Sequence, residues 1–130
     1  MLERDWRLFL RDGSGKEIAI AQVPMSIVGY LGATSDKLFL HHTYAMKAAE
    51  KHGLSPALFS TIFDIVEFGV AISDKPSHVT FFYLVPEVKR WFQVSIKCPE
   101  DSKRLYLVTF HRVGVRKVRN KVEKFEVIKK

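Results

Sequence analysis

The stretch Leu38-Phe-Leu-His-His-Thr-Tyr-Ala-Met-Lys-Ala-Ala-Glu-Lys-His-Gly53 is the centre of the predicted fold and holds three of the chain's five histidines. A short apolar run leads into one helix, with Thr43 or the residue before it as N-cap and Gly53 as its end. Small alanines would let this helix lie close against a sheet. At helical spacing the polar groups form two neighbouring sides, His42 with His52 and Tyr44 with Lys47 and Lys51. Imidazole, ammonium and phenol groups together suit the handling of a phosphate.

The segments on either side predict an α+β fold, with two or three helices packed on a small antiparallel sheet. Residues 6–21 indicate a β-hairpin around the turn Asp12–Gly15, and residues 24–32 a short helix. Ser55-Pro56 is typical of a helix start, so an amphipathic packing helix is expected up to Gly69.

Three alternating segments then predict a strand meander, at residues 78–84, 89–98 and 103–112. In the last of these, strict alternation puts Thr109 and His111 on one side with Leu105 and Leu107, opposite Phe110. The tail from residue 113 to 130 has valines at mostly helical spacing. A helix is favoured there over a final strand at 125–128.

Bulk composition indicates one domain over residues 1–130, long enough to bury a core of its own. The single cysteine, Cys98, cannot form an internal disulfide, which fits a cytoplasmic protein. The N-terminus lacks the apolar core of a signal peptide, and no apolar run approaches the roughly 20 residues of a membrane span, so no membrane association is expected.

The positive charge is concentrated in the last third of the chain. Residues 1–86 carry 8 Lys/Arg and 9 Asp/Glu, a charge of −1, whereas residues 87–130 carry 13 and 5, a charge of +8, which together give the net +7. A basic surface at one end favours a polyanionic partner, and nucleic acid ahead of an anionic membrane. Basic tails that only aid solubility are the plain alternative.

The candidate site combines two groups of residues. One is the histidine helix, and the other is the end of the last strand together with the basic residues that follow it: Thr109, His111, Arg112, Arg116, Lys117 and Arg119. Metal-independent ribonucleases need a base, an acid and cations that stabilise the charge on phosphorus. Histidine can serve in either proton role near neutral pH. Adjacent histidines point apart and no carboxylate lies at ligand spacing, so neither a metal nor another cofactor is expected.

The order of these motifs resembles the barnase–EndoU–colicin–RelE superfamily of nucleases, and its phage-associated branch in particular. The resemblance rests on Val28–Gly32, on Leu38–Thr43 and on a helix that closes with Lys51-His52, and it covers roughly residues 27–113. It implies a RelE-like nuclease core with a basic tail, 114–130, outside the family pattern. It also implies a toxin or phage-derived setting, RNA as substrate and a cognate antitoxin or immunity protein as a further partner.

The sequence and this resemblance together predict an endoribonuclease that cleaves RNA by transesterification from the 2′-OH. The expected catalytic residues are His52, His111, Thr109, Lys47 and His42. The expected RNA-binding residues are Lys51, Arg112, Arg116, Lys117 and Arg119. Two alternatives stay open: a non-catalytic nucleic-acid-binding protein that uses residues 87–130, and a small phage or inhibitor-type interaction module that presents Trp91 and Tyr106.

Overall fold

The computed structural model describes residues 1–130 and confirms an α+β architecture built on one mixed, seven-stranded sheet in the order β1-β2-β6-β5-β4-β3-β7. The strands are β1 Glu17–Gln22, β2 Lys37–His41, β3 Val70–Lys75, β4 His78–Val85, β5 Arg90–Lys97, β6 Leu105–Arg112 and β7 Glu126–Lys129. The helices are α1 Glu3–Asp12, α2 Met25–Leu31, α3 His42–His52, α4 Pro56–Phe59, α5 Ile62–Phe68 and α6 Val115–Lys124.

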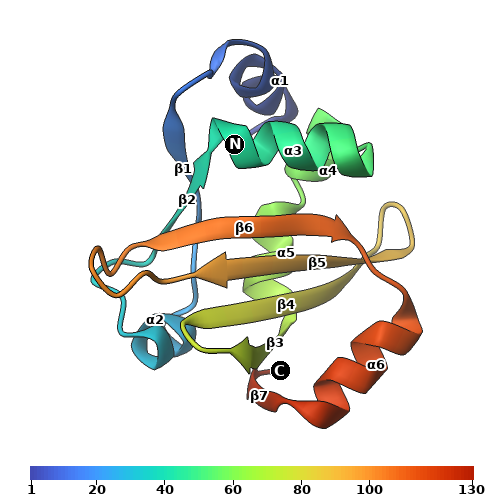
Figure 1. The fold of residues 1–130 in the computed structure, drawn as a ribbon. Helices are drawn as coiled ribbons and strands as arrows, with labels where there is room; N and C mark the ends of the chain where they lie inside the picture. The colour runs from blue at the N-terminus through green and yellow to red at the C-terminus, as the bar shows by residue number, and fades with distance from the viewer.

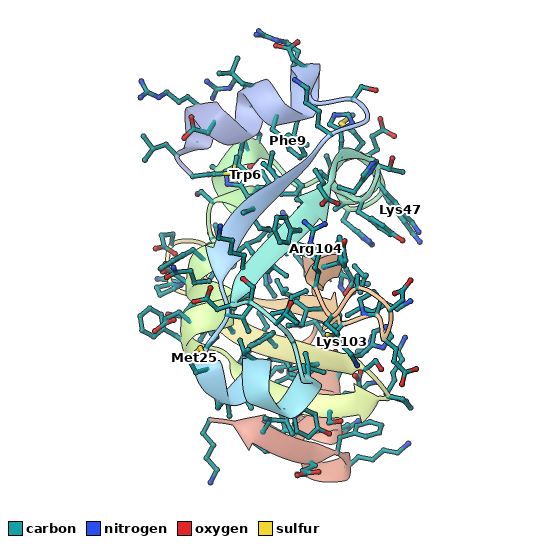
Figure 2. All side chains as sticks on the ribbon, turned by 90° about the vertical axis from the view of Figure 1, so that its left-hand side faces the viewer. Trp6, Phe9, Met25, Lys47, Lys103 and Arg104 are labelled. Carbon is teal, nitrogen blue, oxygen red and sulfur yellow. The ribbon has the colours of Figure 1, made fainter.

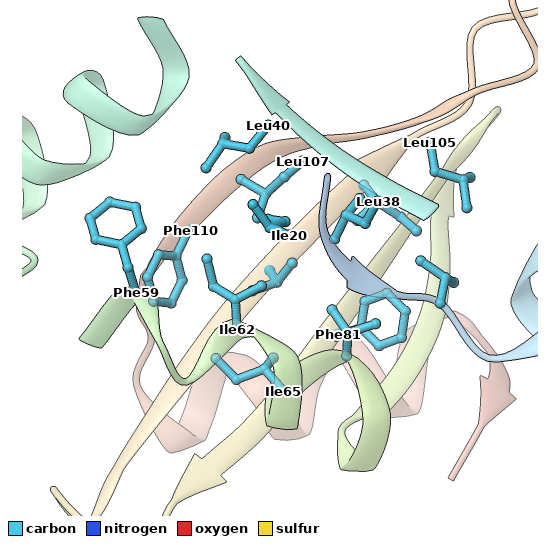
Figure 3. Close-up of a cluster of buried hydrophobic side chains, with 14 of the residues drawn as sticks. Ile20, Leu38, Leu40, Phe59, Ile62, Ile65, Phe81, Leu105, Leu107 and Phe110 are labelled. Atoms are coloured by element: carbon cyan, nitrogen blue, oxygen red, sulfur yellow. The ribbon is translucent and has the colours of Figure 1, made fainter. Parts of the chain in front are cut away.

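One face of the sheet carries the main core, with α5 packed against it, whereas the centre of the other face has no helix across it (Figure 1). Figure 3 shows this core, in which side chains of α4 and α5 meet those of β2, β4 and β6. Helix α3 lies along the edge of β6, with Ala45 and Ala48 in the main core, and α6 packs on the other face beside β3 and β7. The strip between these two helices is the open face.

The N-terminal segment forms helix α1 where a first hairpin strand was expected, so that part of the prediction was wrong. Trp6 and Phe9 lie three residues apart and are both buried under α1 (Figure 2), as one side of a helix requires. The backbone N–H of Leu2 donates to the carboxylate of Asp5 at 2.8 Å, which satisfies a free donor at the helix start. The second predicted strand of the hairpin is present as β1.

Two other segments differ from the prediction. The packing helix is divided into α4 and α5, because the hydroxyls of Ser60 and Thr61 each donate to a backbone carbonyl three residues earlier, at 2.6 Å. The tail forms both of its alternatives in sequence, α6 and then β7, which pairs antiparallel with the unpredicted strand β3.

The sheet is mixed and not purely antiparallel, because β2 and β6 pair in parallel, over Leu38–Leu105 and Phe39–Tyr106 only. Beyond Phe39, β2 turns away into α3, where His41 is the N-cap: its Nδ1 accepts from the backbone N–H of Thr43 at 3.1 Å. Gly53 ends α3 with a φ of 62°, a conformation that glycine adopts without strain. At this edge, the later half of β6 therefore lies beside a helix, while its other edge stays paired with β5.

A β-bulge in β6 overturns the strict alternation expected for this strand. The register with β5 shifts between Ser95 and Ile96, so that Ser95 faces Thr109 while Ile96 faces Leu107, and Val108 is the extra residue. Leu107 and Phe110 consequently both point into the main core. Because directly opposed residues share a face, Thr109 lies with Ser95, and His111 with Gln93, on the open face.

Candidate functional site

A cleft of about 210 Å³ lies where α3 runs beside the later half of β6. It exists because β2 leaves the edge of β6 after two paired residues, and α3 fills that place at a greater distance. One wall is α3 and the other is the bulged part of β6. The lining residues are Tyr44, Lys47, Ala48, Lys51, His52, Leu107, Val108, Thr109, Phe110 and His111.

His52 and His111 meet at one end of this cleft, from elements that are far apart in the sequence. Their ring centroids are 5.0 Å apart and the planes are inclined at 42°. The guanidinium of Arg112 donates to the backbone carbonyl of His52 at 3.2 Å. This bond satisfies a free carbonyl at the C-terminus of α3 with a cation and fixes the helix end to the strand end.

The hydrogen bond of His111 determines which of its ring nitrogens is free. Nδ1 of His111 lies 2.8 Å from the carbonyl oxygen of Arg112, which can only accept, so Nδ1 carries a proton and donates. The Nε2 atom is left to accept a proton when the ring is neutral and to donate one when the ring is charged.

The electrostatic environment of His52 favours its neutral form. Burial lowers the pKa of His52 below its ordinary value, and the neighbouring charges of His111, Lys51 and Lys47 lower it further. A histidine that is neutral near pH 7 can accept a proton, which is the property a general base needs.

Two buried polar atoms of the open face lack a hydrogen-bond partner, the hydroxyl of Thr109 and the side-chain oxygen of Gln93. Thr109 lines the cleft, and Gln93 is the cross-strand neighbour of His111. Buried polar groups in native proteins nearly always have a partner, so an unpaired one at a cleft is a place where a ligand group can bond.

Replacing Thr109 by valine tests whether the Thr109 hydroxyl binds a ligand or stabilises the fold. Valine has nearly the same shape and removes a buried hydroxyl that bonds nothing within the protein, so we expect stability to stay equal or to rise by about 1 kcal/mol. The RNA cleavage expected from the sequence should slow by roughly tenfold, the loss of one hydrogen bond of about 1.4 kcal/mol. Urea unfolding measures the stability and the initial rate on RNA measures the cleavage, and a clear loss of stability would assign the hydroxyl to the fold.

The cleft brings together Lys47, Lys51, His52, Thr109 and His111, five of the residues expected in the site, with Arg112 beside them. In Figure 2, Lys47 projects from α3 away from α5.

The structure does not bring His42 into the cleft. His42 lies at the opposite end of α3, about 15 Å along the helix from His52 at 1.5 Å per residue. Its Nε2 donates to the carbonyl of Leu10 at 2.9 Å, and its ring packs edge-on against Phe9 at 5.4 Å. His42 therefore joins α1 to α3 and has a structural role here.

The basic residues of the tail also lie outside the cleft. Arg116 and Lys117 line a separate groove along α6, and Arg119 is exposed on the same helix. One further residue of the open face was not expected in the site, Gln93 beside His111. The alternation of residues 89–98 placed Gln93 and Ser95 on the same side of their strand. The sequence could not show which residues of β6 lie opposite them.

Comparison of the chain with protein-family models, with curated proteins and with solved structures found no match. None of the helices combines the length and apolar character that crossing a membrane requires. No three His, Cys, Asp or Glu side chains are grouped so that they could hold a metal ion.

Proposed function

We propose that the protein is a metal-independent endoribonuclease, which cleaves RNA by transesterification at the cleft between α3 and β6. The observation that carries the proposal is the pairing of His52 with His111 at 5.0 Å, in a cleft that also holds two lysines and an unpaired hydroxyl. Two imidazoles at one phosphate can supply the base and the acid of such a reaction. Uncontrolled RNA cleavage would harm the cell that makes the protein, so we also propose a partner protein that covers the cleft and inhibits cleavage.

His52, whose lowered pKa keeps it neutral, accepts the proton of the ribose 2′-OH. The 2′-oxygen attacks phosphorus and forms a P–O2′ bond, and the P–O5′ bond breaks. His111 gives a proton to the departing 5′-oxygen through its free Nε2, so that charge and protons balance. Lys47 and Lys51 stabilise the negative charge on the phosphate oxygens, and the Thr109 hydroxyl donates to one of them.

The test is cleavage of total RNA by the purified protein in excess EDTA. We expect cleavage to persist, with 2′,3′-cyclic phosphate ends on the products. The same RNA with 2′-O-methyl riboses should stay intact, because it lacks the attacking hydroxyl. Cleavage that EDTA abolishes, or cleavage of the methylated RNA, would contradict the proposed chemistry.

The pH dependence of cleavage should report the pKa of His52 and the positive charges near it. Because His52 must be neutral to act as the base, cleavage should rise with pH through the pKa of His52, with a midpoint below the ordinary value of about 6.5. Replacing Lys51 with alanine removes a positive neighbour, which stabilises the imidazolium, so the midpoint should move to higher pH. Rate profiles and NMR titration of the His52 ring measure this, and Lys16→Ala, remote from the cleft, should change neither.

A second candidate function is RNA binding without cleavage, and the charge of α6 favours it. Arg116, Lys117 and Arg119 are exposed and form no ion pair. A binder predicts salt-sensitive RNA affinity that survives the loss of His52 and His111, together with intact RNA in the EDTA assay.

A further inference from the structure

Two more hollows lie beyond the ends of β5 and β6 and along α6. The first, of about 360 Å³, is lined by Arg90, Trp91, Arg112, Val113 and Gly114. The second, of about 580 Å³, runs along α6 and is lined by Gly114, Arg116, Lys117, Asn120, Lys121, Lys124 and Phe125. Gly114 belongs to both hollows, and Arg112 joins the first to the cleft through its bond to His52. We call the path formed by these two hollows the basic track.

Trp91 is the aromatic residue of the basic track, and it is held in a fixed position while remaining partly accessible. One part of its side chain packs against the small core cluster of Ile72, Phe82 and Val118, which joins α6 to the sheet. The backbone carbonyl of Trp91 accepts from the N–H of Val113 at 3.0 Å. An indole fixed in this way can stack on a planar ligand group with little loss of conformational freedom.

Most cations of the basic track form no ion pair, and Arg112 keeps a hydrogen bond to the carbonyl of His52. The ion pairs of the structure involve Arg7, Arg11, Arg104 and Lys121. Arg90, Arg112, Arg116, Lys117 and Lys124 are all exposed and belong to none of them. Only Lys121 has a carboxylate, that of Asp74 at 3.7 Å, so the track carries a large excess of positive charge.

We infer that the basic track is a binding site for the single-stranded RNA next to the cleaved phosphate, with one unpaired base stacked on Trp91. The inference rests on the proposed function for the direction of the strand, from the cleft toward α6. Cations along a groove that also contains an aromatic platform are the features of sequence-tolerant single-strand binding. A duplex keeps its bases stacked on each other, so it can use the cations but not Trp91.

Binding of a 2′-O-methyl oligouridylate tests this inference without interference from cleavage. Such an oligomer is single-stranded and has no attacking 2′-OH. The chain has two tryptophans, and Trp6 is 2% exposed, so quenching of tryptophan fluorescence by the oligomer reports on Trp91. We expect quenching to saturate with the same Kd as fluorescence anisotropy of a labelled oligomer.

Trp91→Leu should weaken binding roughly tenfold, equal to about 1.4 kcal/mol. Trp91→Phe keeps an aromatic face and should restore most of the affinity, which separates stacking from a loss of packing. The matched control is Phe68→Ala, which removes an aromatic side chain that is 59% exposed on α5. This control should bind as the unmodified protein does.

The charges are tested by Arg116→Ala/Lys117→Ala against Arg4→Ala/Lys16→Ala, two pairs of exposed cations that form no ion pair. Loss of two phosphate contacts to a single strand should reduce the slope of log affinity against log salt by about 1.4 for the α6 pair only. Unquenched Trp91 at saturation, equal affinity of Trp91→Leu and Phe68→Ala, or a duplex that depends equally on Trp91 would each overturn the inference. Trp91-dependent binding without cleavage of unmodified RNA would disprove the proposed function alone.

Discussion

Alanine at His52 or at His111 is expected to slow RNA cleavage by about 10²–10⁴-fold, the contribution of a positioned general base or acid. The two rings act on opposite ends of one bond rearrangement, so each loss alone disables the concerted step. The double variant should therefore be little slower than the worse single variant, because groups that act as a unit are not additive. Initial rates on a defined RNA in EDTA measure all three proteins.

His78→Ala is the matched control for these variants. His78 begins β4 and bonds the carbonyl of Pro76 at 2.8 Å, outside the cleft lining. We expect its rate to match that of the unmodified protein, and we expect RNA affinity to survive in every histidine variant because the cations remain. Undiminished cleavage in the double variant would show that the cleft between α3 and β6 is not the site.

The histidine helix was the part of the fold that its sequence determined most directly. An apolar strand, alanines on the buried side and a glycine stop are local signals, and α3 ends before Gly53 as expected, although its N-cap is His41 and not Thr43 or His42. Local signals could not show that His42 faces α1, because α1 itself was expected to be a strand. The side of a helix that becomes functional depends on which neighbours cover its other sides.

The bulge at Val108 is the feature of the site that alternation could not predict. Without the bulge, Thr109 and His111 would lie on the same face as Leu107, among the side chains of the main core. The bulge shows only in the pairing with β5, where Ser95 lies opposite Thr109 and Ile96 lies opposite Leu107. Pairing is a long-range property, and a single extra residue reverses every side chain that follows.

The local sequence pattern likewise could not predict where the basic tail lies on the sheet. Its charge indicated a polyanion, but α6 is placed by β7, which closes the far edge of the sheet against β3. The cations of α6 therefore lie in a hollow along this helix, outside the cleft. Both alternatives for the tail were correct in part, because a helix and a strand each find a partner on the same sheet.

Phe110→Ala should be the most destabilising change near the cleft. Phe110 is 1% exposed and packs between Phe59 of α4, at a centroid distance of 5.4 Å, and Phe92 of β5, at 5.8 Å. Removing a buried phenyl ring costs about 3–5 kcal/mol, for lost burial and for the cavity that remains. In a domain of this size we expect a fall in Tm of roughly 10–20 °C.

The same variant connects the core to the site. Phe110 stands between Thr109 and His111 in β6, and it points into the core while they face the open side. A cavity behind the strand lets β6 relax at its bulge, so the folded variant should lose cleavage by more than tenfold below its Tm, whereas Phe68→Ala keeps both stability and rate. Phe110→Leu, which fills most of the space, should recover stability and cleavage together. Recovered stability without recovered cleavage would mean that the ring, and not the packing, serves the site.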